Sequence, residues 1–201
     1  MSTQYESIKT ATLYPDVFHV AAPVSSVGRE VWPRQPGVFI RAAQARQAEE
    51  VEEIEEIEEI EEADKPPREL SRELVAGQFG LVPRWVKSAS DAKLRSTKLV
   101  NARSETVTTS NNFRDAWLGG QRCIVPMMAF MEDDWRSGKA VPTRIARVDG
   151  EPMGAAGLWE SWTGAEGEVI TSYTLLTVNA NSHALMSRYQ QPGNEKRILS
   201  A

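Results

Sequence analysis

Short apolar runs separated by turn signals fill the sequence from residue 78 onward, and this alternation constrains the fold more than any other feature. Residues 121–132 (QRCIVPMMAFME) and 170–180 (ITSYTLLTVNA) are rich in β-branched and aromatic side chains, which favour buried strands. Stretches with Gly, Pro and polar residues, typical of turns, lie at residues 136–142, 148–152 and 163–168. The pattern predicts a fold built mainly from strands.

Shorter elements complete this picture. Further strands are expected at residues 18–23 (FHVAAP) and 37–41 (GVFIR), and short helices at residues 113–118 (FRDAWL) and 183–190 (HALMSRYQ). Strands and helices do not alternate along the chain as they do in a Rossmann sheet. We therefore predict a strand-rich α+β fold with a few short helices.

A Glu-rich insertion interrupts the chain at residues 45–67. Residues 49–64 hold ten Glu, one Asp and no basic residue, and an apolar residue recurs every three positions from Val51 to Ile60. A three-residue repeat drifts around a helix of 3.6 residues per turn and makes no single apolar stripe. We predict an exposed helical or disordered segment that projects from the folded part and ends at Pro66 and Pro67.

The net charge of −5 conceals a basic body. Without the eleven acids of residues 49–64, 17 acidic residues face 23 basic ones, which leaves a net charge of +6. A basic surface of this size suits contacts with nucleic acid phosphates. On charge alone, ordinary solvated surface charge is the favoured explanation.

The composition limits the compartment and the cofactor classes. One cysteine, Cys123, excludes an intramolecular disulfide and fits a reducing cytoplasm. One Cys and two His argue against a structural zinc site, and we expect no metal and no cofactor. No run approaches the roughly 20 apolar residues that cross a bilayer, and the first twenty residues do not form a secretory signal. We expect a monomer in the cytoplasm that does not contact membranes.

Four motifs occur in order in the second half of the chain. They are GLVPRW at 80–85, NARSET at 101–106, RCIVPMMAFME at 122–132 and AAGLWESW at 155–162, with TVNAN following at 177–181. In this order and at these separations they resemble the SOS response-associated peptidase (SRAP) family, which processes abasic sites in DNA. The resemblance covers residues 78–192. It implies a single domain over residues 1–201 with a twisted, partly closed β-sheet.

The resemblance also implies a DNA-binding surface. An abasic site is a sugar aldehyde in a strand that cannot pair there, so its recognition needs cations for phosphates and aromatic faces for unpaired bases. We expect Trp85 to stack on a base and the phosphates to be bound by Arg84, Lys87, Arg103 and Arg114, with Arg122 as a further cation. Trp85 as a core residue, and Arg103 as a simple ion-pair partner of Glu105, remain open alternatives.

Two catalytic residues follow from the same resemblance. Asn101 offers both a donor and acceptors for orienting the sugar, and Glu132 offers a carboxylate for proton transfer. We predict that Asn101, Arg103 and Glu132 line one pocket with Ser2 at its mouth. Cys123 lacks a neighbouring base in the sequence and is predicted to be a buried apolar residue.

The chain departs from the family at two decisive positions. The family begins Met-Cys-Gly-Arg, and its exposed cysteine traps the aldehyde as a thiazolidine. Here Ser2 stands at the cysteine position, and a hydroxyl is a much weaker nucleophile than a thiolate. The family's I-H-x-R-M-P histidine falls on Arg188, which leaves His183 and His19 as candidate replacements for the imidazole.

The implied function is therefore binding of single-stranded or abasic DNA in the SOS DNA damage response, with stable cross-linking lost. Whether lyase or self-processing peptidase activity survives stays open, as does a natural start that carries Cys at position 2. No Ser-His-Asp arrangement supports general proteolysis. The alternative from another class is a non-enzymatic adaptor whose acidic insertion binds a basic protein partner.

Overall fold

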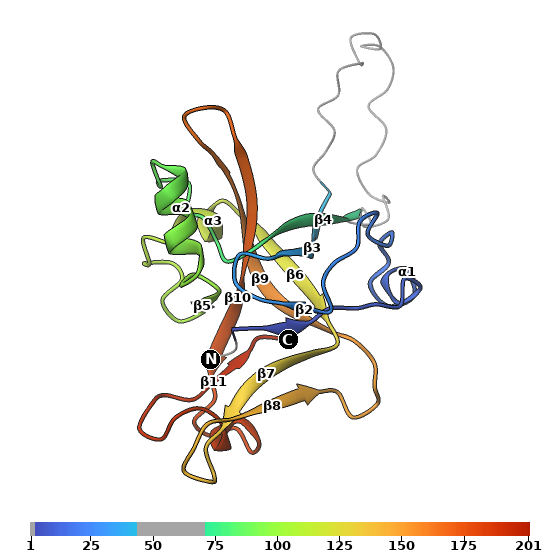
Figure 1. Ribbon diagram of the computed structural model, residues 1–201, viewed down its shortest axis with the longest axis vertical. Coiled ribbons are helices and arrows are strands. Elements are labelled where there is room, and N and C mark those ends of the chain that lie inside the picture. The colour runs from blue at the N-terminus through green and yellow to red at the C-terminus, as the bar shows by residue number, and fades with distance from the viewer. Residues whose placement is uncertain (1–2, 44–70) are drawn as a thin grey trace, which may run out of the picture.

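The computed structural model describes residues 3–43 and 71–201 (Figure 1). The strands are β1 (Tyr5–Glu6), β2 (Glu30–Val31), β3 (Pro36–Ala42), β4 (Arg72–Phe79), β5 (Asn101–Arg103), β6 (Arg122–Met127), β7 (Ala129–Asp134), β8 (Val141–Ala146), β9 (Met153–Thr163), β10 (Val169–Asn179) and β11 (Arg197–Leu199). The helices are α1 (Leu13–Phe18), α2 (Ala89–Ser96), α3 (Arg114–Leu118) and the 3₁₀ turn η1 (Met186–Arg188). No helix in these ranges combines the length and apolar character that a bilayer crossing requires.

The larger sheet curls until it meets itself. Its strands run in the order β10, β4, β3, β6 and β9, and β9 pairs with β10 again to complete the ring. The closure is partial, because β3 and β6 share only the pair Ile40 and Ile124. Strands β5 and β11 extend the sheet beyond the ring by pairing with the second half of β10. This confirms the strand-rich α+β fold with a partly closed sheet.

Aromatic side chains fill the inside of this ring. The rings of Phe79 and Tyr173 are stacked at an interplanar angle of 28° with centroids 5.6 Å apart, and Tyr5 meets Phe79 edge-on at 5.4 Å. The hydroxyl groups of Tyr5 and Tyr173 share a hydrogen bond in this fully buried environment. Gly37 on β3 makes room for the pair, because a Cβ atom there would overlap with the Tyr173 hydroxyl. Tyr5 thereby fixes the N-terminal strand to the core.

A second, smaller sheet holds the N-terminal strand next to β7. Its order is β2, β1, β7 and β8, and Tyr5 on β1 pairs with Phe130 on β7. The amide of Met131 donates to the carbonyl of Gln4 at 3.3 Å. This hydrogen bond places Gln4 beside Met131, the residue before Glu132. The start of the described chain therefore leads to Glu132.

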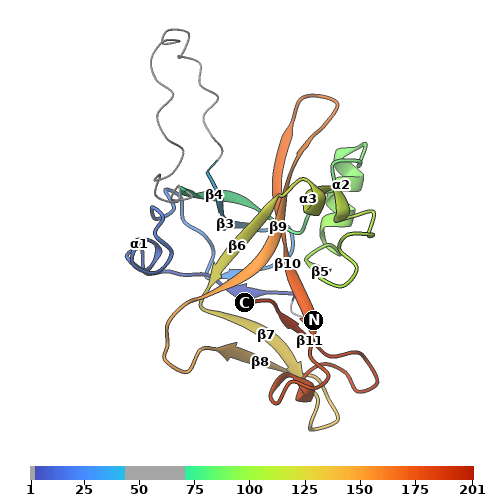
Figure 2. The ribbon, with the colours of Figure 1, turned by 180° about the vertical axis from the view of Figure 1, so that it is seen from behind.

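The helices flank the ring on two sides. Figures 1 and 2 place α2 and α3 beside β9 and β10, and α1 on the far side of the sheet. The predicted helix at residues 113–118 is confirmed as α3. The predicted strand at residues 37–41 is confirmed within β3.

Three local predictions were wrong. Residues 18–23 form no strand, because α1 ends at Phe18 and His19 adopts a left-handed conformation (φ 57°) that closes the helix. Residues 121–132 form two strands in different sheets instead of one. Residues 183–190 contain a single 3₁₀ turn where a helix was expected. The predicted insertion at residues 45–67, with its candidate protein partner, lies outside the described residues.

Candidate functional site

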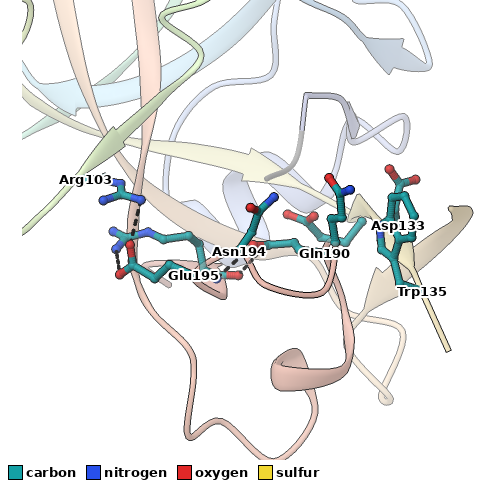
Figure 3. A pocket seen from close by; sticks show the side chains of 9 residues that line it. Arg103, Asp133, Trp135, Gln190, Asn194 and Glu195 are labelled. Atoms are coloured by element: carbon teal, nitrogen blue, oxygen red, sulfur yellow. Dashed lines mark hydrogen bonds and ion pairs between the residues drawn. The ribbon is translucent and has the colours of Figure 1, made fainter. Parts of the chain in front are cut away.

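An open cavity of about 370 Å³ lies where β5, the end of β7 and the C-terminal segment meet. We call it the Glu132 cavity. Figure 3 shows its lining as a row, with Arg103 and Glu195 at one end, Asp133 and Trp135 at the other, and Asn194 and Gln190 between them. The full lining is Arg103, Glu132, Asp133, Trp135, Gln190, Gln191, Asn194, Glu195 and Arg197. Most of these side chains are polar, which suits a hydrophilic ligand such as a sugar.

A chain of ion pairs forms one wall of this cavity. Arg197 is only 2 % exposed, and its guanidinium binds Glu105 at 2.7 Å and Glu195 at 3.0 Å. Glu195 also binds Arg103 at 2.7 Å and so bridges the two arginines. The Arg197 side chain lowers the pKa of Glu105 to about 2. The pKa of Glu195 is lowered too, first by the Asn179 amide and then by Arg197. Both carboxylates are therefore ionised at neutral pH.

The opposite wall holds the carboxylate of Glu132. Glu132 lies on β7 opposite Thr143 and is 6 % exposed. The segment after η1 extends this wall, because the amide of Gln190 donates to the carbonyl of Asp133 at 2.8 Å. Gln190 adopts a left-handed conformation (φ 68°), and its side chain makes two hydrogen bonds to the backbone of Arg197. Gln190 thus ties the two walls together.

The structure brings together two of the three residues predicted to share a pocket. Arg103 and Glu132, which come from separate motifs, both line the Glu132 cavity. Asn101 lies on the same face of β5 as Arg103, two residues earlier, but it is not among the lining residues. Ser2 lies outside the described residues. Cys123 is buried as predicted, and burial raises the pKa of its thiol.

Arg188 and His183 lie outside the cavity lining. Arg188 sits in η1, is exposed, and helps to lower the pKa of Asp134, after the larger contribution of Arg136. His183 is exposed, and its Nδ1 atom accepts hydrogen bonds from the amides of Leu185 at 3.2 Å and Met186 at 3.1 Å. His183 therefore closes the turn that leads into η1.

Arg84, one of the predicted DNA-binding residues, lies in a second group of polar side chains. Its guanidinium donates to both carboxylate oxygens of Glu160, at 2.9 and 3.2 Å, and to the side chain of Gln121 at 2.8 Å. Glu160 is 2 % exposed whereas the Arg84 side chain is 57 % exposed. The ion pair therefore fixes one edge of the guanidinium and leaves the rest of it accessible to solvent.

Trp85 is a half-exposed aromatic platform beside Arg84. Its indole nitrogen donates to the carbonyl of Asn111 at 2.9 Å, and the guanidinium of Arg95 lies 4.6 Å from its ring centroid. The other predicted cations are accessible: Lys87 is exposed, and Arg114 forms only a 3.5 Å ion pair with its neighbour Asp115. The contacts with Asn111 and Arg95 orient Trp85 without burying it.

Strand β10 sets the spacing between the two groups. Thr177 pairs with Arg103, Leu175 pairs with Asn101, and Ser172 pairs with Glu160. Five residue steps separate Ser172 from Thr177, which is about 17 Å of strand. Arg84 with its partner Glu160 therefore lies near one part of β10, and the Glu132 cavity lies further along the same strand.

Several residues of the site were not predicted from the sequence. Glu160 could have been found, because a carboxylate between Trp159 and Trp162 in an apolar strand needs a buried partner. Trp135, Gln190 and Arg197 had none, because only long-range packing brings them to the cavity. Within residues 3–43 and 71–201, no cluster of His, Cys, Asp and Glu is arranged to hold a metal ion.

Comparison with known proteins identifies the family. A sequence model of the SOS response associated peptidase (SRAP) family matches residues 13–189. The chain belongs to the SRAP family. A protein from Bordetella bronchiseptica has a similar crystal structure, with a TM-score of 0.78 and 37 % sequence identity, over 98 % of this chain and 82 % of that one.

Two curated relatives of this SRAP protein carry functional names. The abasic site processing protein YoqW of Bacillus subtilis (strain 168) is 34 % identical over 129 residues, which cover 61 % of this chain and 55 % of YoqW. The abasic site processing protein HMCES of Gallus gallus is 26 % identical over 140 residues, which cover 60 % of this chain and 41 % of HMCES. The chain thus spans about half the length of the curated relatives it matches.

Proposed function

We propose that this SRAP protein binds single-stranded DNA at abasic sites, with the abasic sugar in the Glu132 cavity. The observation that carries the proposal is the meeting of Arg103 and Glu132 in one open polar cavity. Strand β7, which carries Glu132, pairs with the N-terminal strand β1. The family match and the names of the curated relatives support it.

In the proposed complex the cations along β10 hold the DNA backbone. Arg84 is fixed by Glu160 and still presents its outer edge to a phosphate. Trp85 is 39 % exposed and offers this accessible part to an unpaired base. Arg103 approaches the phosphate next to the abasic sugar, because it lines the same cavity as Glu132. Such contacts make binding weaker as salt rises.

The chemistry in the cavity is limited by the residue at position 2. An amine freed there by removal of Met1 attacks the aldehyde carbon, water leaves, and an imine forms. Glu132 is placed to deliver and remove the protons of this step. Serine provides no thiol to close a thiazolidine ring, so the imine hydrolyses back to amine and aldehyde. The protein therefore holds abasic DNA reversibly.

The test is incubation with an abasic single-stranded oligonucleotide, with and without borohydride, followed by a denaturing gel. We expect an adduct only with borohydride, which reduces the imine to a stable secondary amine. An oligonucleotide with a tetrahydrofuran residue, which has no aldehyde, should bind without being trapped. The mass of the intact protein should first establish that Met1 is absent.

Two variants test whether Glu132 takes part in imine formation. Glu132→Gln should lower the rate of trapping, whereas Glu151→Gln, which changes an exposed carboxylate before β9, should leave it unchanged. A heat-stable adduct formed without borohydride would contradict the proposed reversibility. Equal trapping by Glu132→Gln and the unaltered protein would remove Glu132 from the mechanism.

A further inference from the structure

A second cavity of about 370 Å³ lies at the opposite end of β10 from the Glu132 cavity. We call it the Arg34 cavity. Its lining is Arg34, Gln78, Ala89, Ser90, Lys93 and Ile170. It contains two cations and a side-chain amide but no carboxylate. The lining alone therefore favours an anionic ligand.

The two cations of the Arg34 cavity differ from the arginines of the other groups. Arg84, Arg95 and Arg103 each form an ion pair with a carboxylate. Neither Arg34 nor Lys93 forms an ion pair with any residue that the structure describes, and both are exposed. Two uncompensated like charges that face one cavity repel each other, and an anion between them relieves that repulsion.

The frame of the Arg34 cavity is well fixed. The amide of Arg34 donates to the carbonyl of Phe79 at 2.7 Å, and the amide of Phe79 donates to the carbonyl of Gln35 at 3.0 Å. This pins the loop that carries Arg34 to the end of β4, next to Gln78. On the other side, Ser88 caps α2 through the amide of Asp91. The first turn of α2 lies at the cavity and adds its positive dipole end.

We propose that the Arg34 cavity binds a phosphate of the same DNA strand whose abasic sugar occupies the Glu132 cavity. The proposal rests on the function proposed above and extends it by a second contact point. Along β10, Ile170 marks the Arg34 cavity and Thr177 pairs with Arg103 of the Glu132 cavity. These residues are seven steps apart, about 23 Å of strand.

This spacing fixes how much DNA is needed to reach both cavities. Stacked nucleotides repeat every 3.4 Å along one strand, so about 23 Å corresponds to roughly seven nucleotides. Arg84 lies between the two ends, because Glu160 pairs with Ser172. The Arg34 cavity therefore contributes only when the oligonucleotide extends far enough from the abasic site on one side.

The experiment compares two tetrahydrofuran-containing oligonucleotides by fluorescence anisotropy, one with three nucleotides on each side of the lesion and one with twelve. The test variant is Arg34→Ala/Lys93→Ala. The charge-matched control is Arg147→Ala/Lys9→Ala, which changes exposed residues outside both cavities. Equal melting temperatures of the three proteins should confirm that the fold is intact.

For the long oligonucleotide, the test variant should flatten the slope of log affinity against log salt by about 1.4, since each single-strand phosphate contact contributes about 0.7. That change corresponds to a loss of affinity of roughly 25-fold at 0.1 M salt. The short oligonucleotide should bind the test variant and the unaltered protein equally well. Equal affinity losses on both oligonucleotides, or no loss on the long one, would overturn the proposal.

A second arm separates this proposal from the proposed function. Inorganic phosphate should shift the backbone amide resonances of Gln78, Ser90 and Lys93 in the unaltered protein, and the Arg34→Ala change should abolish the shifts. If neither oligonucleotide binds but phosphate shifts these amides, the proposed function fails and the cavity is a site for free phosphate. Absence of the phosphate shifts would overturn the anion site itself.

Discussion

The Nη2 atom of Arg84 lies 2.9 Å from the Oε1 atom of Glu160, so an exposed arginine is anchored to a carboxylate that water scarcely reaches. The pKa of Arg84 is raised, first by its hydrogen bond to Glu160 and then by the charge of that residue. Gln121 and the amide of Ser161 also donate to Glu160. The buried carboxylate therefore has a full set of partners, and Arg84 supplies the compensating charge.

Removal of Arg84 should leave that carboxylate without its cation. We expect Arg84→Ala to lower the free energy of unfolding by about 2 kcal/mol, because the charge of Glu160 stays buried with only neutral donors. For a chain of this size the loss corresponds to a melting temperature lower by about 4–8 °C. Adding Glu160→Gln to Arg84→Ala should restore part of the stability. A double variant less stable than Arg84→Ala would contradict this explanation.

Arg103 is the cation whose effect on DNA binding should be separable from stability. Its partner Glu195 keeps a second cation, Arg197, so Arg103→Ala should change the unfolding free energy little. The slope of log affinity against log salt should flatten by about 0.7 for single-stranded DNA. Arg147→Ala, on the exposed turn after β8, is the matched control. An unchanged slope for Arg103→Ala would exclude a phosphate contact.

Acid should weaken the wall formed by Glu105 and Arg197. The folded-state pKa of Glu105 is lowered from 4.5 to about 2, mainly by the hydrogen bond from Arg197. A depressed folded-state pKa contributes stability that is complete above pH 4.5 and is lost as the pH falls toward 2. Melting temperatures measured between pH 2 and 6 should therefore fall less steeply for Glu105→Gln than for the unaltered protein. Parallel curves would show that the pair is too solvated to matter.

Gly37 should be a sensitive position in the core. A Cβ atom there overlaps with the hydroxyls of Tyr173 and Tyr5, so Gly37→Ala must displace a fully buried pair. We expect a destabilisation of about 1–3 kcal/mol, the usual cost of overpacking. Tyr173→Phe removes the nearer hydroxyl and should reduce the cost of Gly37→Ala when the two changes are combined. Additive effects of the two changes in urea denaturation would contradict the overlap.

The overall fold class could be predicted from the sequence. Apolar runs ended by turn residues predicted a strand-rich fold, because burial of alternate side chains leaves a local pattern. The same reasoning missed the break at Met128, where a continuous apolar run passes from one sheet to the other. Apolarity indicates burial but does not distinguish the sheet in which a residue is buried.

The site was predictable only where a motif contributed residues to it. Arg103 and Glu132 were named from their motifs and do share a cavity. The wall opposite Glu132 consists of Glu195 and Arg197, and it depends on the pairing of β11 with β10 at the end of the chain. The three residues of β11 carry no local sequence pattern that would predict this pairing. The role proposed for Arg34 could not be predicted from the sequence either, because it depends on the cavity that Arg34 shares with Gln78 and Lys93.

A cysteine at residue 2 should restore the formation of a stable adduct. A stable thiazolidine requires an amine and a thiol on adjacent carbons, which only an N-terminal cysteine provides. Cys123 cannot replace it, because its nitrogen is in a peptide bond and its thiol is buried with a raised pKa. Ser2→Cys should therefore give a heat-stable adduct with an abasic oligonucleotide in the absence of borohydride.

The position of β1 is the physical reason to expect this gain. The pairing of Tyr5 with Phe130 directs the N-terminal strand along β7, so a thiol at residue 2 should reach the vicinity of Glu132. Glu132→Gln in the Ser2→Cys background should slow adduct formation, and the control Glu151→Gln should not. Arg188→His places an imidazole where the family motif has its histidine and should raise the yield further. If Ser2→Cys binds abasic DNA but forms no adduct after Met1 has been removed, then residue 2 does not reach the bound sugar, and the Glu132 cavity is a recognition site only.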